Sequence, residues 1–408
     1  MTPRPSSNSD LNRKHMNVWI QNPFDNLPSE GYRKQRYWLM AEAFVRAGYQ
    51  VTVWTSDFNH VGKRYRGLGG LEGLGGLEVR LIPTRAYRKN VSFERVRSHC
   101  AYAREWERLV ESEVTRLKSL PAPDLIVTSI PTIGAAETAI RLARRFGAKV
   151  VVDVQDAWPE TFERLAPRGF RWLARLAFLG LRRRAQRIYR EADLMTGVCD
   201  RYRELTGRPD YYRAYLGIEK KSSLTSSVSR LAPRPLRLVY SGNLGRTYDL
   251  ETVVRGLAAE ASLDIAGKGD GEAALKRLVK DLRLEDRVKF HGYLSQDELG
   301  VLLRSCDIGI VPMASESFVG VPNKFADYAS AELAIVSSLG GESAVLLAKY
   351  GCGESYAAGD AKDFAAAVMR LRTRLSEARH GAARLATEEF DAVKIYDGYV
   401  NTALTNIS

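Results

Sequence analysis

The sequence has no run of about 18 uncharged apolar residues, so we expect no membrane-spanning helix. Residues 1–15 are polar and lack the apolar core of a secretory signal, and we expect them to form a disordered tail. The four cysteines are widely scattered, which fits neither a zinc site nor a disulfide framework and favours a reducing cytoplasm. No Asp-any-Asp motif follows a predicted strand, so neither a metal site nor a bound cofactor is expected.

Positive charge is in excess. The chain has 61 Lys and Arg against 48 Asp and Glu, a formal net charge of +13. Such an excess favours an anionic partner, which could be a lipid surface, a nucleic acid or a diphosphate substrate. The length of 408 residues favours two domains.

Predicted strands and helices alternate in two series, on either side of a Ser-rich linker at 221–235. Two such series imply two doubly wound α/β domains facing one cleft, over 16–220 and 236–381. A glycine-rich repeat at 67–78 is interpreted as a loose connection. The first series has strands at 16–21, 51–55, 79–82, 124–128, 149–154 and 194–198. Its helices are at 33–47, 93–117 and 133–146, and a long helical region follows the strand 149–154 and ends at residue 190. The second has strands at 236–240, 262–266, 288–291 and 308–311, and helices at 250–259, 272–282 and 296–304.

The stretch Ser315–Val336 predicts a glycine-containing loop, a short helix and an apolar strand. Gly320 lets the backbone approach a ligand, and Pro322 suits the first turn of a helix, where its missing N–H is not needed. The free N–H groups of that helix start and the cation of Lys324 favour an anionic ligand. Asp327 projects from a neighbouring position and can accept hydrogen bonds from ribose hydroxyls. Together they predict a nucleotide-sugar pocket; a capped surface helix with a Lys–Asp pair is the alternative.

Three glycine turns follow predicted strands in the second half of the chain. Glycine after a strand lets a phosphate approach backbone amides, and three such turns along one sheet edge form a ligand crevice. Three ordinary strand-to-helix loops are the alternative. The predicted donor-binding residues are Gly242, Asn243, Gly245 and Arg246 in the first turn, Gly267, Lys268 and Gly269 in the second, and Gly292 and Tyr293 in the third.

Two aspartates lie near the carboxyl end of the strand at 149–154, where the active sites of α/β proteins open. A carboxylate there can orient an acceptor hydroxyl and handle its proton. Gln155 lies between the aspartates and cannot act as a general base, so Asp156 is the better candidate for that role. Capping of the next helix is the alternative role for either aspartate.

The segment Arg164–Arg190 holds nine arginines and no acidic residue. Drawn as one helix, it places Arg168, Arg171, Arg175 and Arg182 on one stripe and apolar side chains around the other side. A basic amphipathic helix is typical of contact with an anionic membrane, where each basic residue contributes about 1 kcal/mol. A core-packed helix with a solvated basic face is the alternative. No nucleic-acid contact is expected, because no stacking aromatics follow the arginines in a groove pattern.

Residues 322–328 resemble the donor-binding signature of retaining glycosyltransferases of family 4, which have the GT-B fold of two Rossmann-like domains. In one branch this signature reads Pro, any residue, Lys, two residues, Glu, Tyr. Here it reads Pro322, Lys324, Asp327, Tyr328. The resemblance implies that Asp327 holds the ribose of a nucleotide diphosphate sugar, with a reach one methylene shorter than that of the usual Glu.

The resemblance also implies that the loop before this signature touches the sugar ring, through Val319, Gly320 and Val321. The family's first glutamate has its counterpart at Val319, and Glu316 is an approximate substitute for it. Asp156 and Glu316 are therefore the predicted catalytic residues.

Segment 153–160 resembles the branch motif Asp, two residues, Asp, any residue, Trp-Pro-Glu. The loop 28–33 occupies the place of a family loop that meets diphosphate and acceptor. Gly31, Arg33 and Asp153 are accordingly expected at the acceptor or phosphate. Arg33 and Arg36 could equally be solvated helix positions.

Thr247–Asp249 stands where the family has a further lysine, so Arg246 or Lys324 must supply the charge at the diphosphate. The resemblance implies that residues 382–408 form a helical segment that crosses back to the first domain.

These features predict a retaining, metal-independent glycosyltransferase. It would move a sugar from a nucleotide diphosphate to a lipid-linked or saccharide acceptor, in cell-surface polysaccharide or glycolipid synthesis. We expect it in the cytoplasm, attached peripherally to the inner face of the plasma membrane. The alternatives are a nucleotide-sugar 2-epimerase, for which only His291 is plausibly placed, and a non-catalytic basic scaffold for lipid or nucleic acid.

Overall fold

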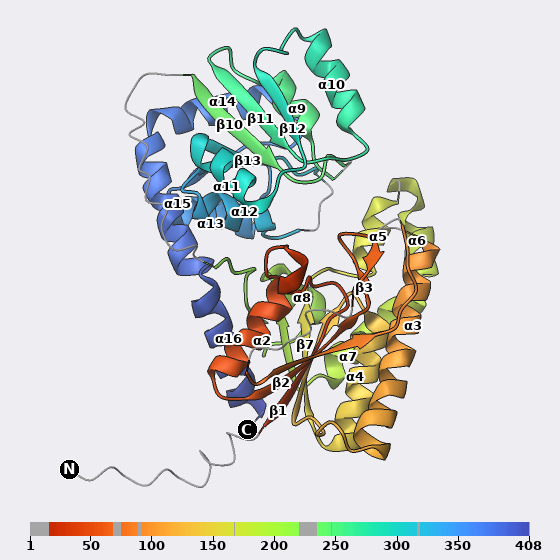
Figure 1. Ribbon diagram of the computed structural model, residues 1–408. Coiled ribbons are helices and arrows are strands. Elements are labelled where there is room, and N and C mark those ends of the chain that lie inside the picture. Colours follow the sequence, from red (N-terminus) through yellow and green to blue (C-terminus); the bar gives the residue numbers. More distant parts are fainter. Residues whose placement is uncertain are drawn as a thin grey trace, which may run out of the picture. The chain divides into compact units, whose positions relative to one another are not determined.

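The computed structural model describes residues 16–67, 75–88, 92–166, 168–219, 235–245, 247–315 and 319–407, apart from the side chains of residues 162, 164, 165, 168 and 407. These residues form two compact units (Figure 1): one up to Ala214 together with those from Val393 onward, and one over Tyr215–Ala392. Several predictions fall outside the described residues, namely the tail 1–15, most of the linker 221–235, most of the repeat 67–78, Arg246, Glu316 and the side chain of Arg168.

The first unit is built on a seven-stranded parallel sheet in the order β5-β2-β1-β6-β7-β8-β9. Its central strands are runs of apolar and β-branched residues, and every residue of β6 is buried, as expected of a parallel sheet covered on both faces. The strands are β1 (Asn17–Gln21), β2 (Gln50–Ser56), β5 (Leu77–Ile82), β6 (Leu125–Ile130), β7 (Lys149–Val154), β8 (Leu194–Gly197) and β9 (Tyr212–Arg213), beside a separate hairpin of β3 (Phe58–Asn59) and β4 (Arg64–Tyr65).

Helices and tryptophans complete the first unit. Trp54 lies between Trp19 and Trp106, with ring centroids 5.3 Å and 6.3 Å away, and all three side chains are completely buried. The helices are η1 (Pro28–Glu30), α2 (Arg36–Arg46), α3 (Phe93–Val110), the π-helix η2 (Glu111–Arg116), α4 (Ile133–Phe146), α5 (Glu160–Leu165), η3 (Arg168–Phe170), α6 (Arg171–Ala177), α7 (Leu179–Glu191), α8 (Arg201–Thr206) and α16 (Ala392–Ile407).

The second unit has a six-stranded parallel sheet in the order β12-β11-β10-β13-β14-β15. Its core joins strand residues such as Leu238 and Ile308 to Phe364 and Leu371, and all four are completely buried. The strands are β10 (Leu236–Ser241), β11 (Ala261–Ala266), β12 (Val288–Gly292), β13 (Ile308–Val311), β14 (Ala334–Ser337) and β15 (Gly353–Ser355). The helices are α9 (Leu250–Arg255), α10 (Glu272–Asp281), α11 (Gln296–Ser305), α12 (Asn323–Ser330), α13 (Glu342–Tyr350), α14 (Ala361–Thr373) and α15 (Leu375–Glu389).

The predicted alternation of strands and helices is confirmed, and several predicted bounds are wrong. α2 begins at Arg36 rather than 33, because Gln35 before it has an extended backbone with φ −105° and ψ 179°. α9 ends at Arg255 rather than 259: Gly256 follows it, and a Cβ there would overlap with the carbonyl oxygen of Ala361. The predicted helix 93–117 becomes α3 followed by a π-helix.

Two longer predicted helices are divided. The region up to Arg190 consists of short helices, with a break at Phe178 between α6 and α7. The C-terminal helical region breaks between α15 and α16, around Phe390 and Asp391. α15 packs against α12 and α13 in the second unit, so only α16 joins the first unit. There Arg46 forms an ion pair with Asp397, which holds α16 against α2 (Figure 1).

Candidate active site

The glycine turns lie side by side at the carboxyl ends of β10, β11 and β12. The Gly242 N–H donates to the carbonyl of Ala266 at 2.8 Å, and the Gly267 N–H donates to the carbonyl of Gly292 at 2.7 Å. Gly242 and Gly267 have φ angles of 138° and 142°, which side-chain-bearing residues rarely adopt. A Cβ at Gly267 would also overlap with the carbonyl oxygen of Gly242. The three turns therefore need glycine in order to pack against one another.

The remaining side chains of these turns face outward. Lys268 and Asn243 are exposed, and Tyr293 is 66% exposed. Gly245 lies over the Asn243 side chain, and a Cβ on Gly269 would overlap with Leu244 and Asn243. The structure therefore brings Gly242, Gly267 and Gly292 together and leaves the polar side chains of the turns accessible to a ligand.

Lys324 reaches the first glycine turn from α12. A Cβ on Gly242 would lie 2.5 Å from its Nζ. The ammonium also lies over two aromatic rings, 5.0 Å from the centroid of Tyr240 and 4.1 Å from that of Tyr248. Burial lowers the pKa of Lys324 to about 8, while the nearby charge of Asp327 acts in the opposite direction. A buried cation is thus aimed at the backbone where a diphosphate would lie.

The tyrosine of the signature fixes α12 in place. The hydroxyl of Tyr328 accepts a hydrogen bond from the N–H of Ser241 at 3.0 Å and donates to the carbonyl of Ile310 at 3.3 Å. Its ring packs where a Cβ on Gly309 would stand. Tyr328 therefore connects α12 to the ends of β10 and β13 and sets the position of Lys324.

Asp327 is half-buried on α12, one turn from Lys324. In the loop before the helix, Gly320 and Val321 are buried, Val319 is half-buried, and the Gly320 carbonyl accepts a hydrogen bond from Ser343 Oγ at 2.5 Å. Glu316 lies outside the described residues, so its catalytic role stays a prediction.

Asp153 does not have the predicted acceptor role in this structure. Its carboxylate is completely buried and accepts hydrogen bonds from Nε and Nη2 of Arg36, both at 2.8 Å, and from the hydroxyls of Tyr37 and Thr196, both at 2.7 Å. Burial alone would raise the pKa of Asp153, but the charge and hydrogen bonds of Arg36 outweigh it and hold this pKa below its ordinary value. Because Arg36 is 2% exposed, it is also unavailable to an acceptor phosphate.

Asp156 is half-buried at the end of β7. Its carboxylate accepts hydrogen bonds from Nε1 of Trp158 at 2.9 Å and from Oγ1 of Thr161 at 3.1 Å. Burial raises its pKa, and these two hydrogen bonds only partly offset the effect. A carboxyl group with a raised pKa is better suited to proton transfer near neutral pH than an ordinary aspartate.

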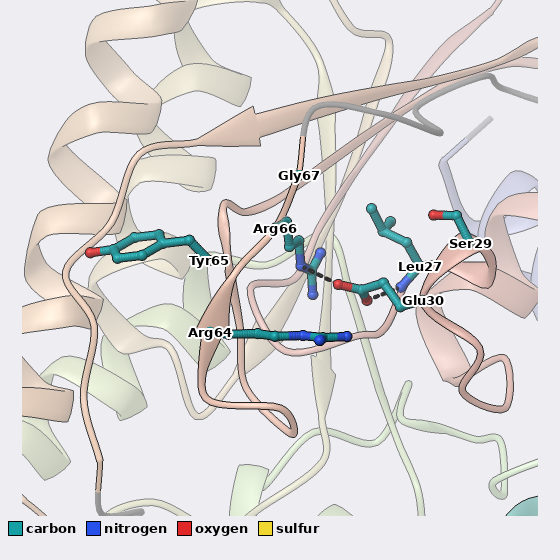
Figure 2. Close-up of a pocket in the computed structure, with 7 residues that line it drawn as sticks. All are labelled: Leu27, Ser29, Glu30, Arg64, Tyr65, Arg66 and Gly67. Carbon is teal, nitrogen blue, oxygen red and sulfur yellow. Dashed lines mark hydrogen bonds and ion pairs between the residues drawn. The ribbon is translucent and has the colours of Figure 1, made fainter.

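A pocket of about 290 Å³ lies beside the first loop of the same unit. Figure 2 shows Glu30 and Arg66 facing each other across it, while Tyr65 points away. Glu30 accepts a hydrogen bond from the N–H of Leu27 at 2.7 Å and lies 3.2 Å from Nε of Arg66. Gly31 closes η1 in a left-handed conformation, with φ 75°, and Arg33 is half-buried. The pocket is lined by Leu27, Ser29, Glu30, Arg64, Tyr65, Arg66 and Gly67.

Two of the four arginines of the predicted stripe approach an acidic side chain. Arg182 forms an ion pair with Glu163, and Nε of Arg175 lies 4.0 Å from the same carboxylate. Nε of Arg171 donates to the carbonyl of Ala166 at 3.4 Å. The acid-free segment is therefore neutralised in part by a glutamate that precedes it.

An apolar surface lies on η3, α6 and the first residue of α7. It consists of large exposed side chains, here called the α6 apolar surface: Phe170, Trp172, Leu173, Leu176 and Leu179. Among the described helices, none is long and apolar enough to cross a membrane.

Sequence reasoning missed the aromatic partners of Lys324. Tyr240 and Tyr248 come from β10 and from the turn before α9, far from α12 in sequence. The one available signal was the resemblance, which implies a family lysine where Thr247–Asp249 stands.

Two parallel α/β units, with glycine turns and a buried lysine at the strand ends of the second, define a nucleotide-sugar-binding transferase fold. The model of "Glycosyl transferase 4-like domain" matches residues 34–214, and that of "Glycosyl transferases group 1" matches residues 236–374. The two matches together span more than half of the chain, which therefore belongs to the group 1, family-4-type glycosyltransferases. A comparison with curated proteins found no match.

Solved structures share the fold over nearly the whole chain. Sucrose-phosphate synthase from Thermosynechococcus elongatus is 14% identical, with a TM-score of 0.68 over 96% of this chain and 100% of its own. HepE of Anabaena in complex with UDP is 14% identical, with a TM-score of 0.65 over 96% and 100%. WaaG, a glycosyltransferase involved in lipopolysaccharide biosynthesis, is 13% identical, with a TM-score of 0.60 over 95% and 98%. The likeness shows a common fold, the GT-B fold.

Family membership decides between the predicted functions at the level of reaction type. The protein is a glycosyltransferase that uses a nucleotide sugar, as predicted. The epimerase and the non-catalytic scaffold are set aside. His291 is the one residue plausibly placed for an epimerase. Its Nε2 lies 2.7 Å from Oδ1 of the buried Asp264 carboxylate.

Proposed function

We propose that this glycosyltransferase is retaining and metal-independent, and that it transfers a sugar to a lipid-linked or saccharide acceptor in cell-surface polysaccharide or glycolipid synthesis. The assignment of the donor-binding site rests on the buried ammonium of Lys324, which lies beside the Gly242 turn, and on Asp327 of the same helix. Lys324 and the start of α12 would bind the diphosphate, and Asp327 would bind the ribose.

In the proposed reaction, the acceptor oxygen bonds to the anomeric carbon while the bond from that carbon to the β-phosphate oxygen breaks. The acceptor proton passes to the leaving phosphate on the same face. Lys324 stabilises the negative charge that develops on the diphosphate, because it is a fixed cation in a largely dry site. Asp156 accepts a hydrogen bond from the acceptor hydroxyl and orients it until the leaving phosphate takes the proton.

A thermal-shift screen with UDP-, GDP- and dTDP-sugars tests the donor assignment. A nucleotide that binds only the folded state raises the melting temperature. At a concentration of 100 times its dissociation constant, it stabilises the folded protein by about 2.7 kcal/mol. HepE, a structural relative, was solved with UDP and with UDP-glucose, so UDP-sugars come first. If no nucleotide sugar stabilises the protein or supports transfer, the proposed donor site is wrong.

We also propose peripheral attachment to an anionic membrane through the α6 apolar surface. Phe170, Trp172 and Leu176 are 60–62% exposed on this surface. The adjoining helix α7 adds the exposed arginines Arg183 and Arg187, which can approach anionic headgroups. Apolar side chains with neighbouring arginines are typical of a helix that lies in the membrane interface. The predicted cytoplasmic location belongs to this proposal.

Vesicle co-sedimentation tests the membrane proposal. Replacing Trp172 and Leu176 by Ser should strongly reduce binding to anionic vesicles, because it removes two insertable side chains without breaking an ion pair. The matched control replaces Val301 and Val345 of the second unit by Ser. These side chains are 63% and 64% exposed, and the control should bind as wild type does. Equal binding of the two double variants, or no binding by the wild type, would refute this attachment.

A further inference from the structure

A cluster of cationic and aromatic side chains in the first unit has no part in the donor chemistry. Its members come from segments that follow β1, β3, β5 and β7 and from the first half of α3. They therefore lie at the carboxyl-end edge of the parallel sheet, where ligands of α/β proteins bind. This imidazole–arginine cluster consists of Phe24, His60, Lys63, Tyr87, Arg95, His99 and Trp158.

Arg95 is the centre of the imidazole–arginine cluster. Its Nε donates to Nε2 of His99 at 3.3 Å, so that imidazole nitrogen is an acceptor. The guanidinium carbon lies 5.1 Å from the ring centroids of both Phe24 and Trp158. His99 in turn stacks on Trp158, with centroids 5.7 Å apart. The guanidinium is thus held in one orientation by three rings.

His60 and Lys63 complete the cluster from the β3–β4 hairpin. A ring nitrogen of His60 is hydrogen-bonded to the hydroxyl of Tyr87, and the ring of His60 lies 5.2 Å from that of Phe24. Lys63 Nζ lies 4.5 Å from the centre of the Tyr87 ring. Lys63, His60, Arg95 and His99 are each half-buried, so a ligand from solvent can reach them.

Positive charge is concentrated here at a cost to the free protein. Burial, together with the charges of Lys63 and Arg95, lowers the pKa of His60 to about 3. Burial, Arg95 and His60 similarly lower the pKa of His99 to about 3. Burial and Arg95 lower the pKa of Lys63 to about 8. A negatively charged group placed among these side chains would relieve the repulsion.

We infer that the imidazole–arginine cluster binds an anionic group, a phosphate or a carboxylate, carried by the sugar acceptor. The inference rests on the proposed function, in which the first unit receives the acceptor. A guanidinium held by aromatic rings can bind an oxyanion through two parallel hydrogen bonds, and the rings can pack against an attached sugar. Trp158 connects the cluster to the reaction, because its Nε1 donates to Asp156 at 2.9 Å. The anionic group would lie near Asp156, the carboxylate proposed to orient the acceptor hydroxyl.

Imidazole NMR of the full-length protein, without donor, tests the inference. The chain has five histidines, and mutation to Gln assigns the signals of His60 and His99. The probes are glucose 1-phosphate, geranyl phosphate and glucuronate, with methyl glucoside as the neutral probe. We expect at least one anionic probe to shift both signals and raise both pKa values, and methyl glucoside to do neither. The charged and titratable groups that face these imidazoles are Lys63, Tyr87 and Arg95, and Asp156 in turn acts on Arg95.

The three anions separate the possible sources of the charge. Tighter binding of geranyl phosphate than of glucose 1-phosphate identifies a lipid phosphate, and the reverse order identifies a sugar phosphate. Tighter binding of glucuronate than of either identifies an acidic saccharide. Each of these orders supports the anion site and names its class of acceptor.

Arg95→Gln should weaken binding of the preferred anion at least tenfold. The matched control is Arg97→Gln, which removes the same charge from an exposed position on α3 and should bind as wild type does. Tryptophan fluorescence on heating verifies that both variants are folded. If no anion shifts the two imidazoles at roughly 10 mM, or if the control loses as much affinity as Arg95→Gln, the inference is wrong.

Calorimetry with UDP separates this inference from the proposed function. UDP would bind the second unit, whereas the imidazole–arginine cluster belongs to the first. Loss of UDP binding in Asp327→Ala with normal anion binding leaves both intact. No nucleotide binding by the wild type contradicts the proposed donor site alone, and no anion binding contradicts the inference alone.

Discussion

Replacing Asp153 by Asn should destabilise the first unit strongly, because it leaves a buried guanidinium without its counter-charge. Arg36 and Asp153 are 2% and 0% exposed and are joined by two hydrogen bonds of 2.8 Å. Asparagine has nearly the same shape, so little volume is lost. The amide removes the negative charge and places an N–H₂ donor among groups that already donate.

The expected loss follows from the burial of the pair. Removing one partner of a buried ion pair typically costs about 3–5 kcal/mol, against about 0–1 kcal/mol for an exposed pair. Replacing both partners should cost less than the sum of the two single changes, since no unpaired charge remains. The variants Asp153→Asn, Arg36→Met and their combination measure this coupling in a double-mutant cycle.

Tryptophan fluorescence is a suitable assay for this cycle. All six tryptophans of the chain fall within the first unit, so their emission follows its unfolding in urea without a contribution from the second. The pKa of Asp153 is below its ordinary value in the folded protein, so the advantage over Asp153→Asn is complete above about pH 4. This advantage should disappear as the pH falls through the folded pKa.

Two results would refute this reasoning. One is a loss of stability in Asp153→Asn below about 1 kcal/mol, the range expected for exposed pairs. The other is a variant of normal stability that has lost transfer to the acceptor. The second result would restore Asp153 to the acceptor site.

Three further predictions concern the donor and the chemistry. Asp327→Ala should raise the dissociation constant of the donor nucleotide at least tenfold, about 1.4 kcal/mol, in calorimetry; unchanged affinity in a folded variant would remove Asp327 from the ribose site. Burial lowers the pKa of Lys324 to about 8, so donor affinity should be constant below this pH and fall up to tenfold per unit above it. Lys324→Gln should bind weakly without that pH dependence, and an identical profile in this variant would contradict the assignment. Transfer should continue in EDTA, and a loss that Mn²⁺ or Mg²⁺ restores would show that the expected metal independence is wrong.

The sequence by itself determined the architecture and indicated where the candidate donor site lies. Hydrophobic runs rich in β-branched residues and helical periodicity are local properties, so the alternation of strands and helices in both units could be predicted, although some short elements and helix breaks could not. Glycines at the ends of three strands, followed by the Pro322–Tyr328 signature, predicted the donor site because parallel strands bring their carboxyl ends to one edge.

Tertiary structure alone decided which charges meet. Asp153 looked like an acceptor residue until Arg36, 117 positions earlier, was found to neutralise it in the core. Arg182 was predicted as part of a membrane-facing stripe, yet it forms an ion pair with Glu163, and Nε of Arg175 lies 4.0 Å from the same carboxylate. Composition and spacing cannot show such pairings, because the energy of a charge depends on the burial and the partners that distant segments supply. The same reason hid the imidazole–arginine cluster, whose members come from five separate segments of the chain and become a site only where those segments converge.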